Sequence, residues 1–326
     1  MTDLGPAGIS GRIDTHTHVV PPFYLDWLDT LPGYAGPRIA WSPEAALDSF
    51  DRLGIAAGIL SISTPGVRYG TNTTIDAIRY LARRVNEYCA DVVRDHPQRF
   101  GFFASLVLPD LQGALTEARH ALDVLGADGV VLPANVDGVY LGTPSWDPLL
   151  ELLDERGTVV FVHPTALAGA PASGLSPAVV DFLADTTRAA ATLVANDCLD
   201  RYPSIRFILA HGGGYLPYAA TRIAAMLSRE RDEDTVLARL RRFYFDTALV
   251  GGPYALPSLL AFADPNRLTF GSDWPYEFRP DQSRDFTARL DAFPIPDELR
   301  AAIDRRNAEA LLPRLAAVGR DLRRGQ

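Results

Sequence analysis

The sequence predicts an α/β fold, a (β/α)8 TIM barrel in which the whole chain, residues 1–326, forms a single domain. Short runs rich in β-branched residues alternate with longer helical stretches eight times along the chain, which is the pattern of this barrel. Several of the runs are continuously apolar, such as VVFV before His163, as expected of parallel strands that are buried on both faces. With 326 residues and a hydrophobic fraction of 47%, the chain can bury a large core.

The expected elements follow one another from the first strand. Strands are expected at Gly11–His18, Ala56–Ser63, Phe100–Leu108, Asp128–Pro133, Thr158–His163, Ile205–His211, Phe243–Asp246 and Leu268–Ser272. Helices are expected between them, at 43–54, Thr74–Asp95, Gly113–Leu125, Pro148–Arg156, Ser176–Arg201, Pro217–Arg229 and Pro257–Phe262. In the first helix, Ser42 can cap the start, Pro43 suits the first turn and Gly54 can end it.

Two segments lie outside this alternation. The segment at about 19–41 follows the first strand and is aromatic and rich in proline and glycine. We expect it to be either a lid over the top of the barrel or a packed surface insertion without a role in substrate binding. The C-terminal stretch at about 281–326 is expected to form a helical cap.

Composition excludes several classes of function. The chain carries 31 basic and 40 acidic residues, a formal charge of −9, and no basic stripe, so we expect no nucleic-acid partner. No apolar run is long enough to span a membrane, and the N-terminus does not resemble a secretory signal. Two cysteines, Cys89 and Cys198, suggest a reduced, cytoplasmic protein. Every basic residue is arginine, which excludes a lysine Schiff base and a carbamylated-lysine metal bridge.

Four histidines and one aspartate stand at the carboxyl ends of predicted strands, where the active sites of barrel enzymes lie. They are His16, His18, His163, His211 and Asp273. His16 and His18 are two residues apart on one strand, so their side chains point to the same side and can reach one ion. A single buried histidine is usually only hydrogen-bonded within a core, but this cluster favours a metal site. Imidazole nitrogens and a carboxylate suit zinc or another first-row divalent ion.

Three residues at or near these strand ends, His211 of the cluster and two further aspartates, have open roles. His211 could be an additional ligand or an acid–base group. Asp14 and Asp246 are expected to support the ligands or the local structure.

The motifs IDTHTH, VVFVHP, FILAHGGG and FGSDWP, in this order, resemble the amidohydrolase superfamily. The chain is most similar to its aminocarboxymuconate-semialdehyde decarboxylase branch, and VPPFY, SISTPGV and FVHPTA look most like the 6-methylsalicylate decarboxylase group. The resemblance covers nearly the whole chain.

The resemblance implies residue roles. The metal ligands would be His16, His18, His163 and Asp273, and the catalytic residues His211 and Asp273. Arg222 matches an arginine that reaches the active site of a neighbouring subunit, which implies a homodimer or a dimer-based oligomer. Besides Arg222, the resemblance gives Arg38 as a substrate-binding residue. Trp41, in the segment after the first strand, and Trp274, directly after Asp273, are expected from their positions either to bind substrate or only to pack. Without a bridging lysine, a site for one divalent metal is favoured, with zinc as first choice and manganese as the alternative.

The reaction implied is metal-dependent, non-oxidative decarboxylation of a small aromatic, salicylate-type acid or of a related ring-cleavage product. His211 or Asp273 would supply the proton to the ring, and the sequence does not rank them. The alternative is a mononuclear hydrolase of a C–C, lactone or amide bond, because the same metal can activate a water molecule. A metal-binding or assembly protein without catalytic activity is the third possibility.

Overall fold

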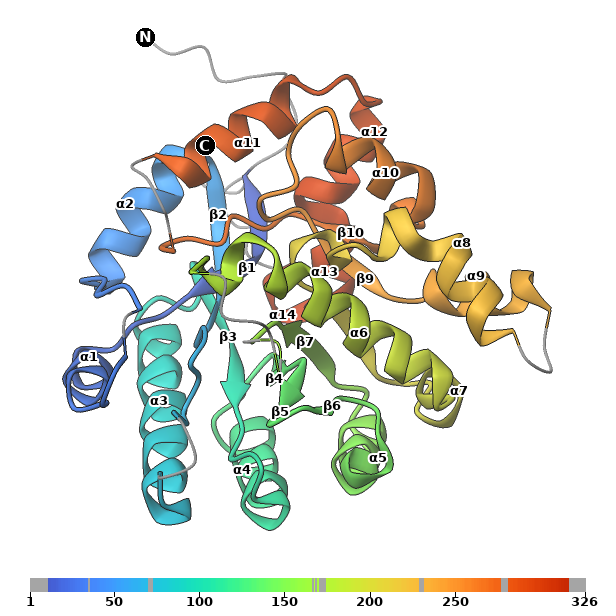
Figure 1. Ribbon diagram of the computed structural model, residues 1–326. Coiled ribbons are helices and arrows are strands. Elements are labelled where there is room, and N and C mark those ends of the chain that lie inside the picture. The colour runs from blue at the N-terminus through green and yellow to red at the C-terminus, as the bar shows by residue number, and fades with distance from the viewer. Residues whose placement is uncertain are drawn as a thin grey trace, which may run out of the picture.

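The structure is a computed structural model that describes residues 11–34, 36–69, 73–165, 167, 169, 174–228, 232–276 and 281–316. It contains the predicted barrel, an eight-stranded parallel sheet in chain order (Figure 1). Its strands are β1 (Arg12–His18), β2 (Ile55–Ser61), β3 (Phe100–Ser105), β4 (Gly129–Pro133), β7 (Val159–His163), β8 (Arg206–Leu209), β9 (Tyr244–Asp246) and β10 (Leu268–Thr269). A parallel bridge between Asp14 and Phe270 joins the first strand to the last and closes the barrel.

Helices surround the sheet (Figure 1). The main ones are α2 (Pro43–Leu53), α3 (Ile75–Asp95), α4 (Leu111–Asp123), α5 (Asp147–Glu155), α6 (Asp181–Ala195), α8 (Leu216–Leu227) and α10 (Ala255–Phe262). The signals predicted for α2 are confirmed: the Ser42 hydroxyl accepts a hydrogen bond from the Ala45 N–H at 3.2 Å, and Gly54 ends the helix with φ 68°. None of the described helices is long and apolar enough to cross a membrane.

The prediction of one helix over Ser176–Arg201 is wrong. The chain forms a short 3-10 turn at Pro177–Val179, then α6, then a separate α7 (Cys198–Arg201). Asp197, between α6 and α7, has φ 55°, a left-handed conformation that interrupts an α-helix. Sequence periodicity also missed α9 (Glu233–Leu240), whose first turn is capped by Asp232.

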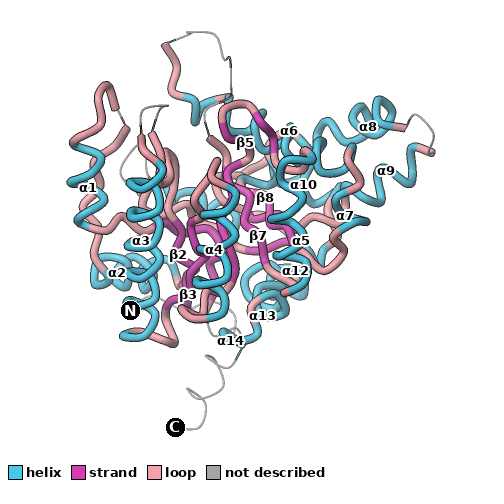
Figure 2. Tube along the Cα trace, turned by 90° about the horizontal axis from the view of Figure 1, so that it is seen from below, coloured by secondary structure: helices cyan, strands magenta, loops and turns pink. Residues whose placement is uncertain are grey.

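In the described part of the chain, five helical elements follow β10, and the last of them close the bottom of the barrel. They are α11 (Gln282–Ala292), which lies in the outer ring in Figure 1, α12 (Asp297–Ala301), a π-helical turn at Ala302–Arg306, α13 (Asn307–Leu311) and α14 (Pro313–Ala316). Leu311 and Leu315 belong to the same buried cluster as Ile13 and Phe161 of the barrel interior. Figure 2 shows α14 at the end of the molecule opposite the loop that carries strand β5 (Asn135–Val136). The carboxyl ends of the strands therefore open on the other side.

The segment after β1 contains helix α1 (Pro22–Asp29). It packs on α3, since the rings of Phe23 and Trp41 each lie 6.0 Å from Tyr88. The Tyr24 hydroxyl donates a hydrogen bond to the Gly66 carbonyl at 2.6 Å, in the loop that follows β2. The described part of the segment is thus packed against the barrel wall, and its role as a lid stays a prediction.

Candidate metal centre and substrate pocket

The four predicted ligands meet at the open end of the barrel. His16 and His18 come from the end of β1, His163 from the end of β7, and Asp273 follows β10. One donor atom from each lies within 4.8 Å of the donor atoms of the other three, and all four residues are buried. The barrel thus brings together side chains that are far apart in the sequence, as the alternation along β1 predicts.

Each of the three imidazoles is oriented by a hydrogen bond from its Nδ1. His16 donates to Asp246 Oδ2 at 2.7 Å, His18 to the Ser61 carbonyl at 3.2 Å, and His163 to the Pro164 carbonyl at 2.9 Å. These acceptors place the proton on Nδ1 in each ring. All three Nε2 atoms therefore present lone pairs to the centre of the cluster.

The atoms of the four ligands that face the centre of the cluster are hydrogen-bond acceptors, and none of these four residues directs a donor at them. Nε2 of His16 lies 3.1 Å from Nε2 of His18, and Asp273 Oδ1 lies 3.2 and 3.1 Å from these two atoms. Nε2 of His163 has no hydrogen-bond partner in the described part of the chain. Lone pairs held this close repel one another unless a cation lies between them. This donor set therefore fits one divalent ion of the kind that accepts nitrogen and oxygen ligands.

A proton on His16 can meet the same demand for positive charge, as the direction of its pKa shift indicates. Burial lowers the pKa of His163 well below its ordinary value and also lowers that of His18. Burial opposes charge on His16 too, but Asp246 and Asp273 outweigh it and raise its pKa to about 10. Burial alone would raise the pKa of Asp273, yet the positive charge on His16 and the adjacent imidazoles hold it well below its usual range.

His211 lies beside the four ligands. Its Nε2 is 3.3 Å from Asp273 Oδ2, the carboxylate oxygen that does not face His16 and His18. The two residues have positive φ angles, 55° for His211 and 64° for Asp273, which residues other than glycine rarely adopt. Such backbone conformations are concentrated at functional sites, where the surrounding structure holds them. Because Oδ1 of Asp273 faces His16 and His18 while its Oδ2 faces His211, Asp273 can contact a metal with one oxygen and His211 with the other.

Asp246 and Asp14 play different parts. Asp246 Oδ2 orients His16, while its Oδ1 accepts hydrogen bonds from the backbone N–H groups of His211 and Ala248, at 2.9 and 3.0 Å. Asp246 thus connects a ligand to the neighbouring strand end. Asp14 instead binds backbone, with Oδ1 accepting from the N–H of His16 at 2.9 Å and of Ser272 at 3.2 Å.

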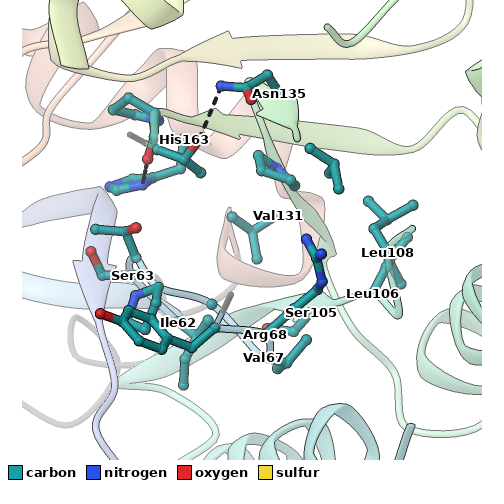
Figure 3. A pocket seen from close by; sticks show the side chains of 18 of the residues that line it. Ile62, Ser63, Val67, Arg68, Ser105, Leu106, Leu108, Val131, Asn135 and His163 are labelled. Carbon is teal, nitrogen blue, oxygen red and sulfur yellow. Dashed lines mark hydrogen bonds between the residues drawn. The ribbon is translucent and has the colours of Figure 1, made fainter. Parts of the chain in front are cut away.

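A pocket of about 460 Å³ adjoins the cluster, with His163 in its wall (Figure 3). This volume suits a small organic ligand. Much of the lining is apolar, and its apolar members include Ile62, Val67, Leu106, Leu108, Val131 and Val136. The polar lining residues include Ser63, Arg68, Ser105, Asn135, Asp137 and Thr165. The pocket therefore offers an apolar space for a ring beside the candidate metal centre.

Sequence reasoning missed Arg68, Asn135 and Asp137. Asn135 and Asp137 belong to a small hairpin of β5 and β6 (Val139–Tyr140). Its two-residue loop is Asp137-Gly138, and both residues have positive φ, as in a type I′ turn. The letters NVDGVY therefore carried a signal for this hairpin. No comparable signal marks Arg68, which lies in an irregular loop.

The four predicted substrate-binding residues do not line the pocket within one subunit. Arg38 donates to Asp29 and is partly exposed, and the Trp41 ring packs against α3. The Trp274 ring faces Phe50 at 6.3 Å, although its carbonyl accepts the His18 N–H at 2.8 Å. Arg222 is exposed on α8. Their roles in substrate binding stay predictions.

Comparison with known proteins agrees with this architecture. The sequence profile of the amidohydrolase family matches residues 13–314. The chain is 34% identical to decarboxylase yanB of Aspergillus niger over 97% of its own length and 90% of that protein. It is also 34% identical to the 6-methylsalicylic acid decarboxylase of Penicillium expansum, over 94% of its length and 98% of that protein.

Its fold matches the crystal structure of an amidohydrolase II with a TM-score of 0.86 and 31% identity, over 93% of this chain and 99% of that one. A family profile that spans nearly the whole chain, relatives matched over most of their length and the clustered strand-end ligands all lead to one assignment. The protein is a member of the amidohydrolase family.

Proposed function

We propose that this protein is a metal-dependent, non-oxidative decarboxylase of a small aromatic, salicylate-type carboxylic acid. The observation that carries the proposal is a ligand cage of three oriented imidazoles and one carboxylate that opens beside a largely apolar pocket. The relatives named as decarboxylases, at 34% identity over nearly the full chain, support the same reaction.

His16, His18, His163 and Asp273 would hold the metal, which would supply Lewis acidity toward the oxygen atoms of the substrate. The apolar walls orient the ring and exclude water from it. His211 and Asp273 Oδ2, 3.3 Å apart, hold a proton between them for delivery to the ring carbon that carries the carboxylate. The bond to the carboxylate carbon then breaks, its electron pair restores the aromatic ring, and carbon dioxide leaves. The proton donor then takes up a new proton from solvent.

The metal in this proposal is a single ion, zinc or alternatively manganese. A bridge through carbamylated lysine is chemically impossible because the sequence contains no lysine. Both ions accept nitrogen and oxygen ligands, so the donor set suits either. We place the protein in the cytoplasm, where its free, buried cysteines Cys89 and Cys198 would stay reduced.

The proposed assembly is a homodimer formed through α8. Tyr218, Arg222 and Met226 are spaced four residues apart and share one face of this helix. Tyr218 is 87% exposed and Met226 is 67% exposed, which is unusual for large apolar side chains so close together. A second copy on this face would cover them and bring Arg222 toward the partner subunit.

The test is elemental analysis combined with carbon dioxide release from a series of salicylate-type acids. We expect about one zinc or manganese per chain, and in heavy water a product ring with one deuterium at the former carboxylate position. Asp273→Ala should lose activity and bound metal together, because one side chain serves both. Full activity with a full metal complement in this variant would overturn the site. Metal without carbon dioxide release from any acid would favour the hydrolase alternative.

A further inference from the structure

The described lining of the pocket contains one strongly basic side chain, and it lies at the outer end. Arg68, in the loop after β2, is the only arginine among the described residues that line the pocket. Its side chain is 19% exposed and that of its partner Asp137 is 55% exposed, whereas His163 at the inner end is 4% exposed. Figure 3 shows Arg68 and His163 on different walls of the pocket. The guanidinium is therefore placed for the part of a ligand that points away from the metal cage.

Arg68 is only partly satisfied by the protein. Its Nη1 donates to Asp137 Oδ1 at 3.0 Å, and its Nη2 lies 2.9 Å from Oδ2. A guanidinium carries five N–H donors in one plane, and no other acceptor contacts this one within the described parts of the chain. The donors that remain can bind a carboxylate or another oxygen acceptor on a ligand.

The wall between the two ends of the pocket has few charges. Apart from Arg68 and Asp137, the described lining contains no arginine, aspartate or glutamate. A ring held among these apolar side chains would present one edge to the ligand cage and the other to Arg68. An acidic group on the outer edge would gain a charged hydrogen bond there, while a methyl group would leave the guanidinium donors to solvent and Asp137.

We propose that Arg68 is a specificity-determining residue that binds a second acidic group on the substrate ring, away from the carboxylate that is lost. This inference rests on the proposed decarboxylation for the identity of the reacting group. The preferred substrate class would be hydroxylated aromatic acids with an additional carboxylate, in preference to those with only apolar substituents. A site built to pair with a charged group discriminates against an analogue that lacks it.

The experiment compares two acids that differ at one ring position. One is a salicylate with a second carboxylate, and its match carries a methyl group at the same position. Arg68→Met should lower kcat/KM for the dicarboxylic acid by about 10- to 100-fold and for the methyl acid by less than about 3-fold, since a charged hydrogen bond is lost only in the first case. Arg68→Lys should retain part of the preference, and Asp137→Asn, which leaves the guanidinium in place, should keep it.

A second readout separates this inference from the proposed reaction. The phenols left after decarboxylation, with and without the second carboxylate, bind without reacting, and calorimetry gives their dissociation constants for wild type and Arg68→Met. A selective loss of affinity for the acidic phenol supports the role of Arg68 even if no acid releases carbon dioxide. Equal losses for both ligands, no loss for either, or a wild-type preference for the methyl compounds would overturn it.

Discussion

Asp246 orients a metal ligand without being one, so its substitution tests the metal centre while all four ligands stay in place. Its Oδ2 holds His16 through Nδ1 at 2.7 Å, which keeps the His16 Nε2 lone pair directed at the cage. Asp246→Asn keeps the size of the side chain but removes the charge that orients the imidazole. We expect metal affinity or activity to fall about 10- to 100-fold, as measured by chelator competition and by carbon dioxide release.

The control for this variant is Asp264→Asn, which changes an exposed carboxylate that caps a 3-10 turn. It should leave metal affinity unchanged. If Asp246→Asn bound metal as tightly as wild type and turned over at the same rate, the orientation of His16 would not depend on this carboxylate.

Among the structural elements, the C-terminal helices should depend on one buried ion pair. Arg12 at the start of β1 donates to Asp304 Oδ1 at 3.0 Å, and both side chains are largely buried. Asp304→Ala leaves the more exposed Asp291 as the one carboxylate that pairs with this guanidinium in the described part of the chain, besides the Leu53 carbonyl. Breaking a buried pair in this way should lower the free energy of unfolding by about 3 kcal/mol, measured by urea denaturation.

Glu298→Ala is the matched control for Asp304→Ala. Glu298 pairs with Arg306 in the same C-terminal region, but both side chains are exposed. Its removal should change the free energy of unfolding by less than about 1 kcal/mol. Similar losses in the free energy of unfolding for the two variants would show that burial does not determine how much these ion pairs contribute to stability.

Individual elements also show how far the sequence could be used. The ligands were predictable because they end strands, where the alternation of side chains and the geometry of a parallel barrel determine which residues meet. The pocket wall was not predictable, because Arg68 lies in a loop that is positioned by hydrogen bonds between residues distant in sequence. These hydrogen bonds join Tyr24 to Gly66 and Arg68 to Asp137. The break at Asp197 escaped prediction for a related reason, since helical periodicity continues across a single left-handed residue.

For the whole molecule, removal of the metal should reduce stability. The cage holds four acceptor groups face to face, so the metal-free protein must accommodate their repulsion or bind a proton instead. A chelator should therefore lower Tm by several degrees, because a ligand that binds only the folded state stabilises it by mass action. Adding zinc or manganese should restore Tm, and the ion that also restores activity identifies the native metal. An unchanged Tm after confirmed metal removal would contradict the cage.

The oligomeric state is a second property of the whole molecule that can be tested. Tyr218→Glu combined with Met226→Glu places two charges on the exposed face of α8 and should convert the proposed dimer to a monomer, as measured by light scattering. Val124→Glu, at a similarly exposed apolar position after α4, is the control and should remain dimeric. If the double variant kept its mass, the subunit contact would lie elsewhere.

The closure of the barrel by its first and last strands has a consequence for biosynthesis. His18 and Asp273 are 255 residues apart in the sequence, yet their donor atoms lie 3.1 Å from each other. A nascent chain exposes its first histidines long before the ribosome has made the aspartate that completes their cage. In the proposed metal-dependent enzyme, binding at the complete cage would therefore follow translation beyond Asp273, and products terminated before this residue would lack one of the four ligands. Bound metal would thus mark chains that have been synthesised past the last barrel strand and have folded.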